Sequence, residues 1–182
     1  ISGSGNVAQY AAEKIIQLGG KVITLSDSSG YILDSDGIKN EKLAFVMDLK
    51  NNKRGRINAY VDTYTNAQFF AHKTPWEQAC DVAMPCATQN ELTHLDAKKL
   101  IDNKCICVCE GANMPSTPEA INLFHKNKIL FAPGKASNAG GVAVSGLEMA
   151  QNSLRYYWSR KEVDEKLGTI MNDIHESCLI YG

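Results

Sequence analysis

The sequence begins with a glycine-rich turn, GSGNVA at residues 3–8, which has the spacing G-x-G-x-x-A. In a dinucleotide-binding turn the first glycine allows a tight bend and the second lets the backbone approach a pyrophosphate. The small third residue lets a helix pack on a strand. An apolar stripe at helical spacing follows, and Gly19-Gly20 ends it. The turn predicts a nucleotide-binding α/β unit; an S-adenosylmethionine or flavin site, or a turn that only packs the unit, stays open.

Apolar runs of strand length alternate with helical patterns along the rest of the chain, which favours βαβ units and a parallel sheet. We expect an α/β fold with a Rossmann-like, doubly wound, mostly parallel sheet, flanking helices and a helical C-terminal tail. Residues 1–150 would form the dinucleotide-binding domain, with its first strand truncated, and residues 151–182 a helical segment. The expected strands are 21–27, 67–71, 81–87, 105–110 and 128–133, with a hairpin at 28–38; the expected helices are 41–51, 95–103, 117–127 and 139–180, with a break near 159–160.

The composition excludes several classes of partner. A net charge of −1 over 182 residues argues against a nucleic-acid or acidic-membrane partner, which would favour a basic excess. No apolar run approaches the roughly 20 residues that span a bilayer.

Cys105, Cys107 and Cys109 alternate, so a strand would place them on one face, and their spacing lacks the CxxC loops of a structural zinc site. We expect buried, reduced thiols in an intracellular protein, and no metal site.

An acidic residue and a basic segment point to the adenosine end of a dinucleotide. Asp27 ends the strand that follows the first helix, at the usual place for a ribose contact. It suits the two hydroxyls of an NAD ribose and would repel a 2′-phosphate. The basic segment KNNKRGR brings Lys50, Lys53, Arg54 and Arg56, and Ser28 adds a hydroxyl, all of which suit a phosphate. These residues alone leave NAD and NADP open.

Five stretches together give the chain a family resemblance. They occur in the family's order and span nearly the whole chain. The chain closely resembles the coenzyme-binding domain of the hexameric glutamate dehydrogenase family, in its NADP-linked members. The stretches are SGSGNVAQYAAEK, SDSSG, PCATQNEL, EGANMPSTPEA and APGKASNAGGVAVSGLEMAQN.

The resemblance implies roles for individual residues. The family often has arginine at the position of Lys53, where lysine keeps the charge but lacks the planar fork. On sequence alone an asparagine beside glycine or proline is more often a turn cap, and Ser145 a hydroxyl inside a helix. By this resemblance, the pyrophosphate would contact Gly3, Ser4, Gly5, Asn6 and Val7, the adenosine ribose would contact Asp27 and Ser28, and the phosphate would contact Lys50, Lys53 and Arg56. The nicotinamide side would contact Ala87, Thr88, Gln89, Asn113 and Asn138. The amino-acid substrate would contact Val142 and Ser145, and Ser145 would bond the side-chain carboxylate of that substrate.

The resemblance also implies an activity, which is hydride transfer between NADP(H) and glutamate or 2-oxoglutarate plus ammonia. NADP is favoured over NAD. The catalytic lysine and aspartate of the family belong to a preceding substrate domain, so we assign no catalytic residue here. We expect this chain alone to be inactive and poorly folded, because truncation of a central first strand leaves its neighbours unpaired. A cytoplasmic homohexamer that works in nitrogen assimilation is implied as well. A leucine- or phenylalanine-type dehydrogenase and a non-catalytic dinucleotide-binding module are the alternatives.

Overall fold

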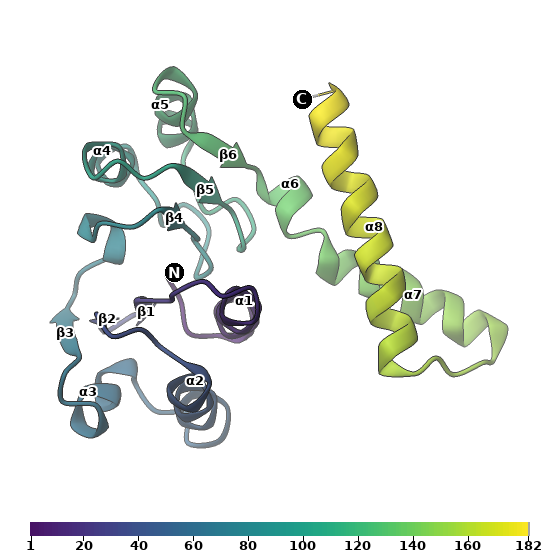
Figure 1. The fold of residues 1–182 in the computed structure, drawn as a ribbon, viewed down its shortest axis with the longest axis horizontal. Helices are drawn as coiled ribbons and strands as arrows, with labels where there is room; N and C mark the ends of the chain where they lie inside the picture. Colours follow the sequence, from purple (N-terminus) through teal and green to yellow (C-terminus); the bar gives the residue numbers. More distant parts are fainter. Residues whose placement is uncertain (182) are drawn as a thin grey trace. The chain divides into compact units, whose positions relative to one another are not determined.

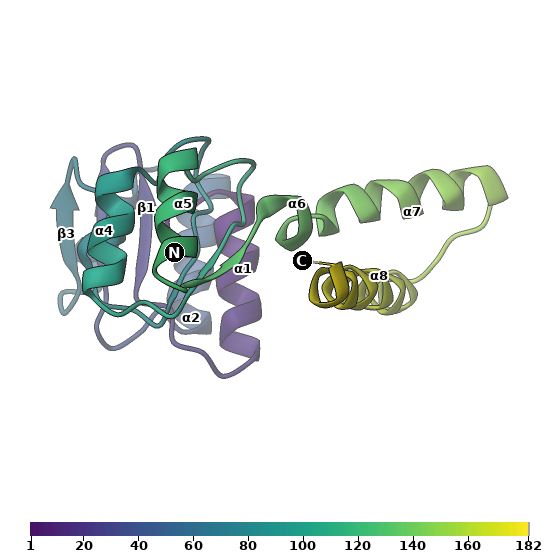
Figure 2. The same ribbon diagram turned by 90° about the horizontal axis from the view of Figure 1, so that it is seen from above.

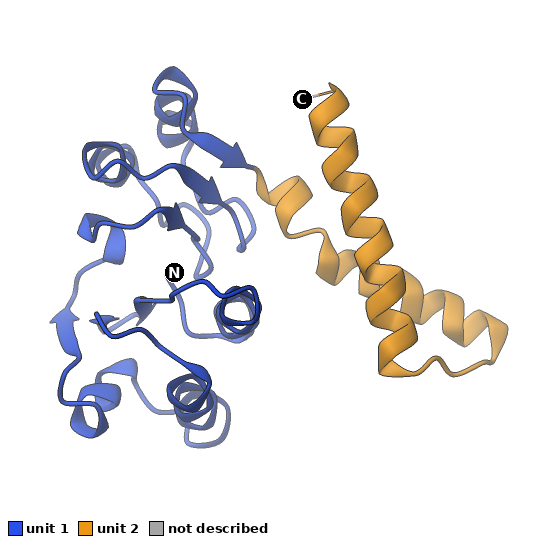
Figure 3. Ribbon diagram, in the orientation of Figure 1, with its two compact units in different colours: residues 1–132 blue, residues 133–182 orange. Residues whose placement is uncertain are grey.

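The computed structural model describes residues 1–181 of the chain. The chain divides into two compact units, residues 1–132 and residues 133–182, which Figure 3 colours separately. The first unit combines strands and helices, and the described residues of the second form helices. The predicted α/β class is therefore confirmed.

Two of the helices of the first unit begin at residues with a clear local cause. Thr93 and Asp96 form a capping box, in which the side chain of each accepts the backbone N–H of the other. Thr117 caps the next helix by accepting the Ala120 N–H, and Pro118 occupies the first helical position. The helices are α1 (Asn6–Gln17), α2 (Asn40–Met47), α3 (Tyr60–Thr63), α4 (His94–Asp102) and α5 (Pro118–Lys126).

The strands of the first unit form two three-stranded sheets, which Figure 1 shows edge to edge. The first sheet, in the order β1-β2-β3, is antiparallel, and the second, in the order β4-β5-β6, is parallel. The described strands therefore do not confirm the predicted single sheet, mostly parallel and doubly wound. The strands are β1 (Thr24–Asp27), β2 (Gly30–Leu33), β3 (Gln68–Ala71), β4 (Val82–Ala83), β5 (Cys107–Cys109) and β6 (Leu130–Ala132).

Two local causes explain the difference. A tight hairpin pairs Asp27 with Gly30, so β2 has to run against β1. The N-terminal residues lie between the sheets without forming a strand: the Ser2 N–H donates to Met84 O (3.1 Å), and the Ser26 N–H donates to Gly3 O (2.9 Å). The expected strand at residues 81–87 is also much shorter, since only β4 forms a ladder there.

Each sheet of the first unit has its own apolar core. α1 and α2 pack against the antiparallel sheet around Leu25, Ile32 and Val46, which are fully buried. α4 and α5, which lie side by side (Figure 2), pack against the parallel sheet around Val108 and Phe124. The cores hold the strands rigidly, and the loops at the strand ends carry the polar residues described below.

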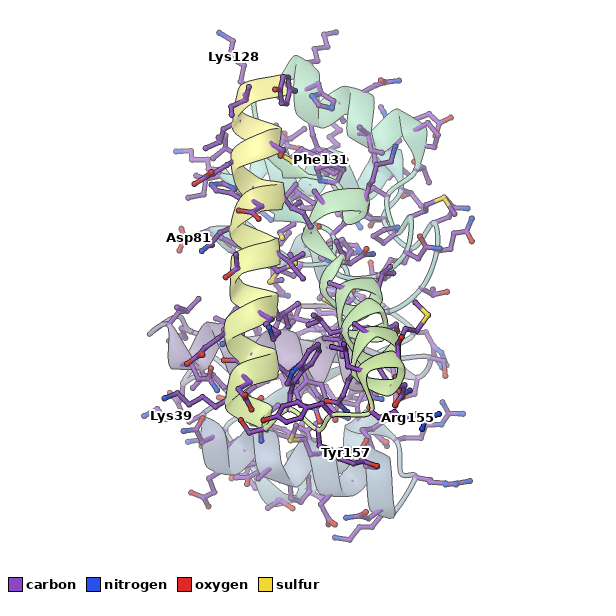
Figure 4. All side chains as sticks on the ribbon, turned by 90° about the vertical axis from the view of Figure 1, so that its right-hand side faces the viewer. Lys39, Asp81, Lys128, Phe131, Arg155 and Tyr157 are labelled. Carbon is purple, nitrogen blue, oxygen red and sulfur yellow. The ribbon has the colours of Figure 1, made fainter. Side chains whose placement is uncertain are left out.

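The second unit contains α6 (Gly134–Ser137), α7 (Gly140–Leu154) and α8 (Arg160–Tyr181), so the expected break near residues 159–160 is confirmed. Arg155 ends α7 in the left-handed conformation, and Tyr157 follows it in the connection to α8 (Figure 4). None of the described side chains of α7 or α8 is buried. Within residues 1–181, no helix has both the length and the apolar character that a membrane crossing needs.

Candidate functional site

The first glycine of the turn is required by its surroundings. Gly3 has φ +81°, a conformation that favours glycine. A Cβ at this position would lie 2.8 Å from Cys86 O and 3.1 Å from Ala87 Cα, so the turn packs directly on the loop after β4. The Gly3 N–H donates to Ser26 Oγ (2.7 Å), which ties the turn to β1 as well. The glycine turn thus lies where the ends of two strands meet.

The N-terminus of α1 is open. Gly5 precedes the helix, no side chain among residues 1–181 caps it, and its first turn has no acidic residue. A Cβ at Gly5 would meet nothing within 4 Å, and Asn6 and Val7 are exposed. The N–H groups and the positive end of the helix dipole therefore face an accessible space, as an anionic ligand requires. By contrast, side chains occupy the N-termini of α4 and α5.

Asp27, at the end of β1, has both carboxylate oxygens bonded within the protein. Oδ1 accepts the Ser29 N–H (2.8 Å) and the Ser29 hydroxyl, and Oδ2 accepts Lys50 Nζ (3.0 Å) and the Ile57 N–H (2.8 Å). Burial acts to raise the pKa of Asp27, but these hydrogen bonds outweigh it and lower the pKa to about 2. Asp27 is therefore ionised and fixed, and it orders the loop beside it.

The basic segment after α2 divides into paired and unpaired charges. Lys50 is paired with Asp27, and Lys53 with Asp48 (2.8 Å), at the surface. Arg56 is exposed and donates through Nη1 to the Ser28 hydroxyl. Among the ion pairs within residues 1–181, no carboxylate offsets Arg56. Arg56, which contacts Ser28, therefore carries a positive charge that no ion pair within residues 1–181 compensates, as does the exposed Arg54 of the same segment.

A pair of amide side chains, one buried and one exposed, joins this segment to the glycine turn. Gln9, fully buried in α1, donates through Nε2 to Ser4 O (2.8 Å) and to Asn51 Oδ1 (3.1 Å). Asn51 Nδ2 returns a hydrogen bond to Gln9 Oε1 (3.0 Å). Hydrogen bonds therefore join the turn predicted to bind the pyrophosphate to the segment predicted to bind the adenosine end of the coenzyme.

The loops after β4 and β5 are bonded to each other. The Asn90 N–H donates to Met114 O (3.0 Å), and both residues have a positive φ, of 56° and 47°. Such backbone costs free energy, about 1–3 kcal/mol for a residue other than asparagine, and is concentrated at functional sites. Ala87, Thr88, Gln89 and Asn113 are exposed on these two loops.

The structure brings most of the predicted site residues together in the first unit. The turn, the basic segment and both loops all lie there. Asn138, Val142 and Ser145 lie in the second unit: Asn138 follows α6, and Val142 and Ser145 are exposed on α7, where Ser145 Oγ donates to Gly141 O (3.2 Å). Their predicted contacts with nicotinamide and substrate stay predictions.

The cysteines differ in burial. Cys86 and Cys105 are buried, which confirms that part of the prediction, but Cys178 is exposed on α8, so the expectation of a buried thiol is wrong there. Cys107 and Cys109 share one face of β5, as the alternation predicts, and Val108 is buried on the other. Within residues 1–181, no group of three histidine, cysteine or acidic side chains is arranged to hold a metal ion.

Two residues that the sequence analysis did not single out support the site. Glu91 accepts the N–H groups of Ala87 (2.8 Å) and Thr88 (3.3 Å), and Glu110, which is buried, accepts the Ser116 N–H (3.2 Å). Both carboxylates hold loops at strand ends. The only sequence signal was an acidic residue within a few positions of a predicted strand end, which is too common to select them.

The comparison with family models matches residues 1–182 to Glutamate/Leucine/Phenylalanine/Valine dehydrogenase. The chain belongs to this family. Among curated relatives of the family, a glutamate dehydrogenase of Bacteroides thetaiotaomicron is 60% identical over 182 residues, which are all of this chain and 41% of that protein. An NADP-specific glutamate dehydrogenase of Haemophilus influenzae is 57% identical, again over the whole chain and 40% of that protein.

Solved structures agree with this family membership. The glutamate dehydrogenase of Plasmodium falciparum is similar with a TM-score of 0.94 and 52% identity, over 97% of this chain and 38% of that one. This chain therefore spans about two fifths of the length of the relatives it matches. The names of the relatives differ in coenzyme: some are NADP-specific, some NAD-specific and one NAD(P)-specific.

Proposed function

We propose that this chain is the coenzyme-binding part of a glutamate dehydrogenase, which transfers hydride between NADP(H) and glutamate or 2-oxoglutarate plus ammonium. Family membership and the relatives' names support the reaction. The coenzyme preference is supported by one observation above all. Arg56 and Ser28 are exposed and joined at the end of β1, whereas the nearby carboxylate of Asp27 is fully bonded.

The residues present fit a dinucleotide. The glycine turn leaves open space at Gly5, and the uncapped N-terminus of α1 would bind the pyrophosphate. Arg56 and Ser28 would bind the 2′-phosphate, and Lys50 would act through Asp27. When bound, the nicotinamide supplies the carbon that donates or accepts the hydride. Ala87, Thr88, Gln89, Asn113 and Asn138 would contact the nicotinamide side; Val142 and Ser145 would contact the amino acid.

The charge balance favours NADP. Asp27 and Lys50 neutralise each other, as do Asp48 and Lys53, so Arg54 and Arg56 keep the positive charge of the segment, and Arg56 is the one that contacts Ser28. An NAD site presents a carboxylate with a vacant oxygen to the ribose hydroxyls. Here each oxygen of Asp27 already accepts two hydrogen bonds. A guanidinium beside a hydroxyl is suited to a phosphate dianion.

The wider setting is proposed with the reaction. Chemistry at the substrate carbon would use a lysine and a carboxylate outside this chain, and the full-length protein would be a homohexamer in the cytoplasm. Amination of 2-oxoglutarate is the direction we expect.

The test uses the full-length protein that carries this chain. Coenzyme oxidation is followed with 2-oxoglutarate and ammonium, with NADPH and NADH side by side. We expect a kcat/KM at least tenfold higher with NADPH. Equal or better use of NADH would refute the phosphate assignment and leave the reaction standing. Turnover with branched or aromatic 2-oxo acids instead would point to a leucine- or phenylalanine-type enzyme, and no turnover at all to a binding module.

A further inference from the structure

Glu91 stands just after the loop that follows β4 and accepts hydrogen bonds from two successive backbone N–H groups of that loop. Oε1 takes the N–H of Ala87 at 2.8 Å and that of Thr88 at 3.3 Å. Two convergent N–H groups on one oxygen fix the position of both peptide planes. The side chain is half-buried, and the loop it holds is exposed.

A second connection runs from Glu91 to the glycine turn. The Ser2 hydroxyl donates to the Glu91 carboxylate, and the same hydroxyl oxygen accepts the Cys86 N–H (3.0 Å). Burial raises the pKa of Glu91, and the hydrogen bonds from Ser2, Ala87 and Thr88 oppose that shift. One carboxylate therefore holds three consecutive residues, 86–88, either directly or through Ser2.

The position of this loop matters for the turn because the two are in contact. The space that a Cβ of Gly3 would need is occupied by Cys86 O and Ala87 Cα. Gly111, at the start of the loop after β5, is equally close: a Cβ there would lie 2.5 Å from Cys86 Sγ and 3.2 Å from Val7 Cγ1. A shift of residues 86–88 would therefore move the turn, the start of α1 and the second loop.

We propose that Glu91 is a positioning residue for coenzyme binding, which holds the backbone of Ala87 and Thr88 in place against the glycine turn. This inference rests on the proposed coenzyme function. It concerns the acceptor geometry of the side chain, because the bonded groups are neutral N–H and O–H donors.

The geometry predicts an order among three variants of the full-length protein. Glu91→Gln keeps the reach and the acceptor oxygen, so its KM for NADPH stays within about threefold of wild type. Glu91→Asp keeps the charge but is one methylene too short, and Glu91→Ala loses both. We expect these two to raise the KM for NADPH about tenfold to a hundredfold, because small displacements of positioning groups have effects of this size. The KM for 2-oxoglutarate is expected to change less than about threefold in all three.

The controls separate positioning from folding. Glu119→Ala removes an exposed carboxylate from the first turn of α5 and should leave both KM values unchanged. A purely structural role would lower the amount of active enzyme, and thus kcat, in proportion to the unfolded fraction, with KM unchanged. Unfolding is followed for each variant by tryptophan fluorescence, to which the buried Trp76 contributes. If Glu91→Ala does not fold, the comparison of Gln with Asp decides.

Two results would overturn the proposal: a Glu91→Ala enzyme with wild-type KM for NADPH, or a Glu91→Asp enzyme that binds NADPH better than Glu91→Gln. A wild-type protein that neither binds nor oxidises NADPH or NADH would refute the coenzyme function itself. Because that last result concerns wild type alone, the two failures are distinguishable.

Discussion

Two of the aspartate–lysine pairs in the first unit have almost the same chemistry and different surroundings. Asp34 pairs with Lys42 at 2.6 Å, and Asp27 pairs with Lys50 at 3.0 Å. The Asp34 side chain is 1% exposed and that of Asp27 is 9% exposed. Asp34 also accepts the hydroxyl of the buried Tyr60 (2.6 Å), inside the core beneath α2.

The difference shows how one interaction serves two purposes. The Asp34 pair joins the end of β2 to α2, and the buried Tyr60 connects it to α3. The Asp27 pair closes the end of β1, and its neighbours Ser28 and Arg56 are exposed. Position within the fold decides that the first pair contributes to stability and the second also shapes a binding surface.

The largest effect is expected from removing the buried carboxylate. Asp34→Ala leaves the ammonium of Lys42 and the hydroxyl of Tyr60 without their acceptor. It should lower the free energy of unfolding by about 3 kcal/mol, as breaking a buried pair does. Urea unfolding of the full-length protein, followed through Trp76, measures this. Asp36→Ala, an exposed neighbour, is the control, and equal effects of the two variants would contradict the comparison.

A smaller, pH-dependent effect is expected at Asp27. Its pKa is lowered from 3.8 to about 2, so its stabilisation is complete above about pH 4 and is lost as the pH falls through about 2. Relative to Asp27→Asn, wild type should be more stable by about 2 kcal/mol at pH 7. That advantage should shrink steadily between about pH 4 and about pH 2. A difference that does not depend on pH across this range would refute the role of the ionised carboxylate.

Arg56 should affect coenzyme choice and leave stability almost unchanged, because its side chain is exposed. Removing a charged donor from a phosphate costs about 1.5–3 kcal/mol, so Arg56→Ala should lower kcat/KM with NADPH about tenfold to a hundredfold. The value with NADH should change by less than about twofold. Parallel losses with both coenzymes would show that Arg56 acts on the turn rather than on a 2′-phosphate.

The smallest effect is expected at Lys53. Both side chains of the Lys53–Asp48 pair are exposed, and such pairs contribute about 0–1 kcal/mol to the free energy of unfolding. Lys53→Ala should therefore change the free energy of unfolding by less than about 0.5 kcal/mol and the NADPH preference by less than about threefold. A larger loss of NADPH preference would mean that Lys53 leaves Asp48 to bind the coenzyme.

Much of the fold of the first unit could be predicted from the sequence. The helical patterns at residues 95–103 and 117–127 located α4 and α5, and the glycine turn located α1, because these signals are local. The hairpin after β1 was also expected from its turn residues. The antiparallel sheet was not, because strand direction depends on which strands become neighbours in space.

The candidate site shows the same limit. Asp27, Ser28, Lys50, Lys53 and Arg56 were all selected by residue type and spacing. Which lysine would neutralise which carboxylate could not be selected, since pairing depends on side-chain geometry across the fold. Glu91 could not be selected for the same reason. It accepts hydrogen bonds from the preceding loop, and no sequence pattern predicts the backbone conformation of that loop.

The absence of buried side chains among the described residues of α7 and α8 has a consequence for local opening. Amide protons in β1 and β2, beneath a packed core, should exchange with solvent deuterium only through large-scale unfolding. Those of α7 and α8 are protected by helical hydrogen bonds alone and should exchange through brief local fraying, far sooner. Slowed exchange in these two helices would therefore report directly when another surface comes to cover them.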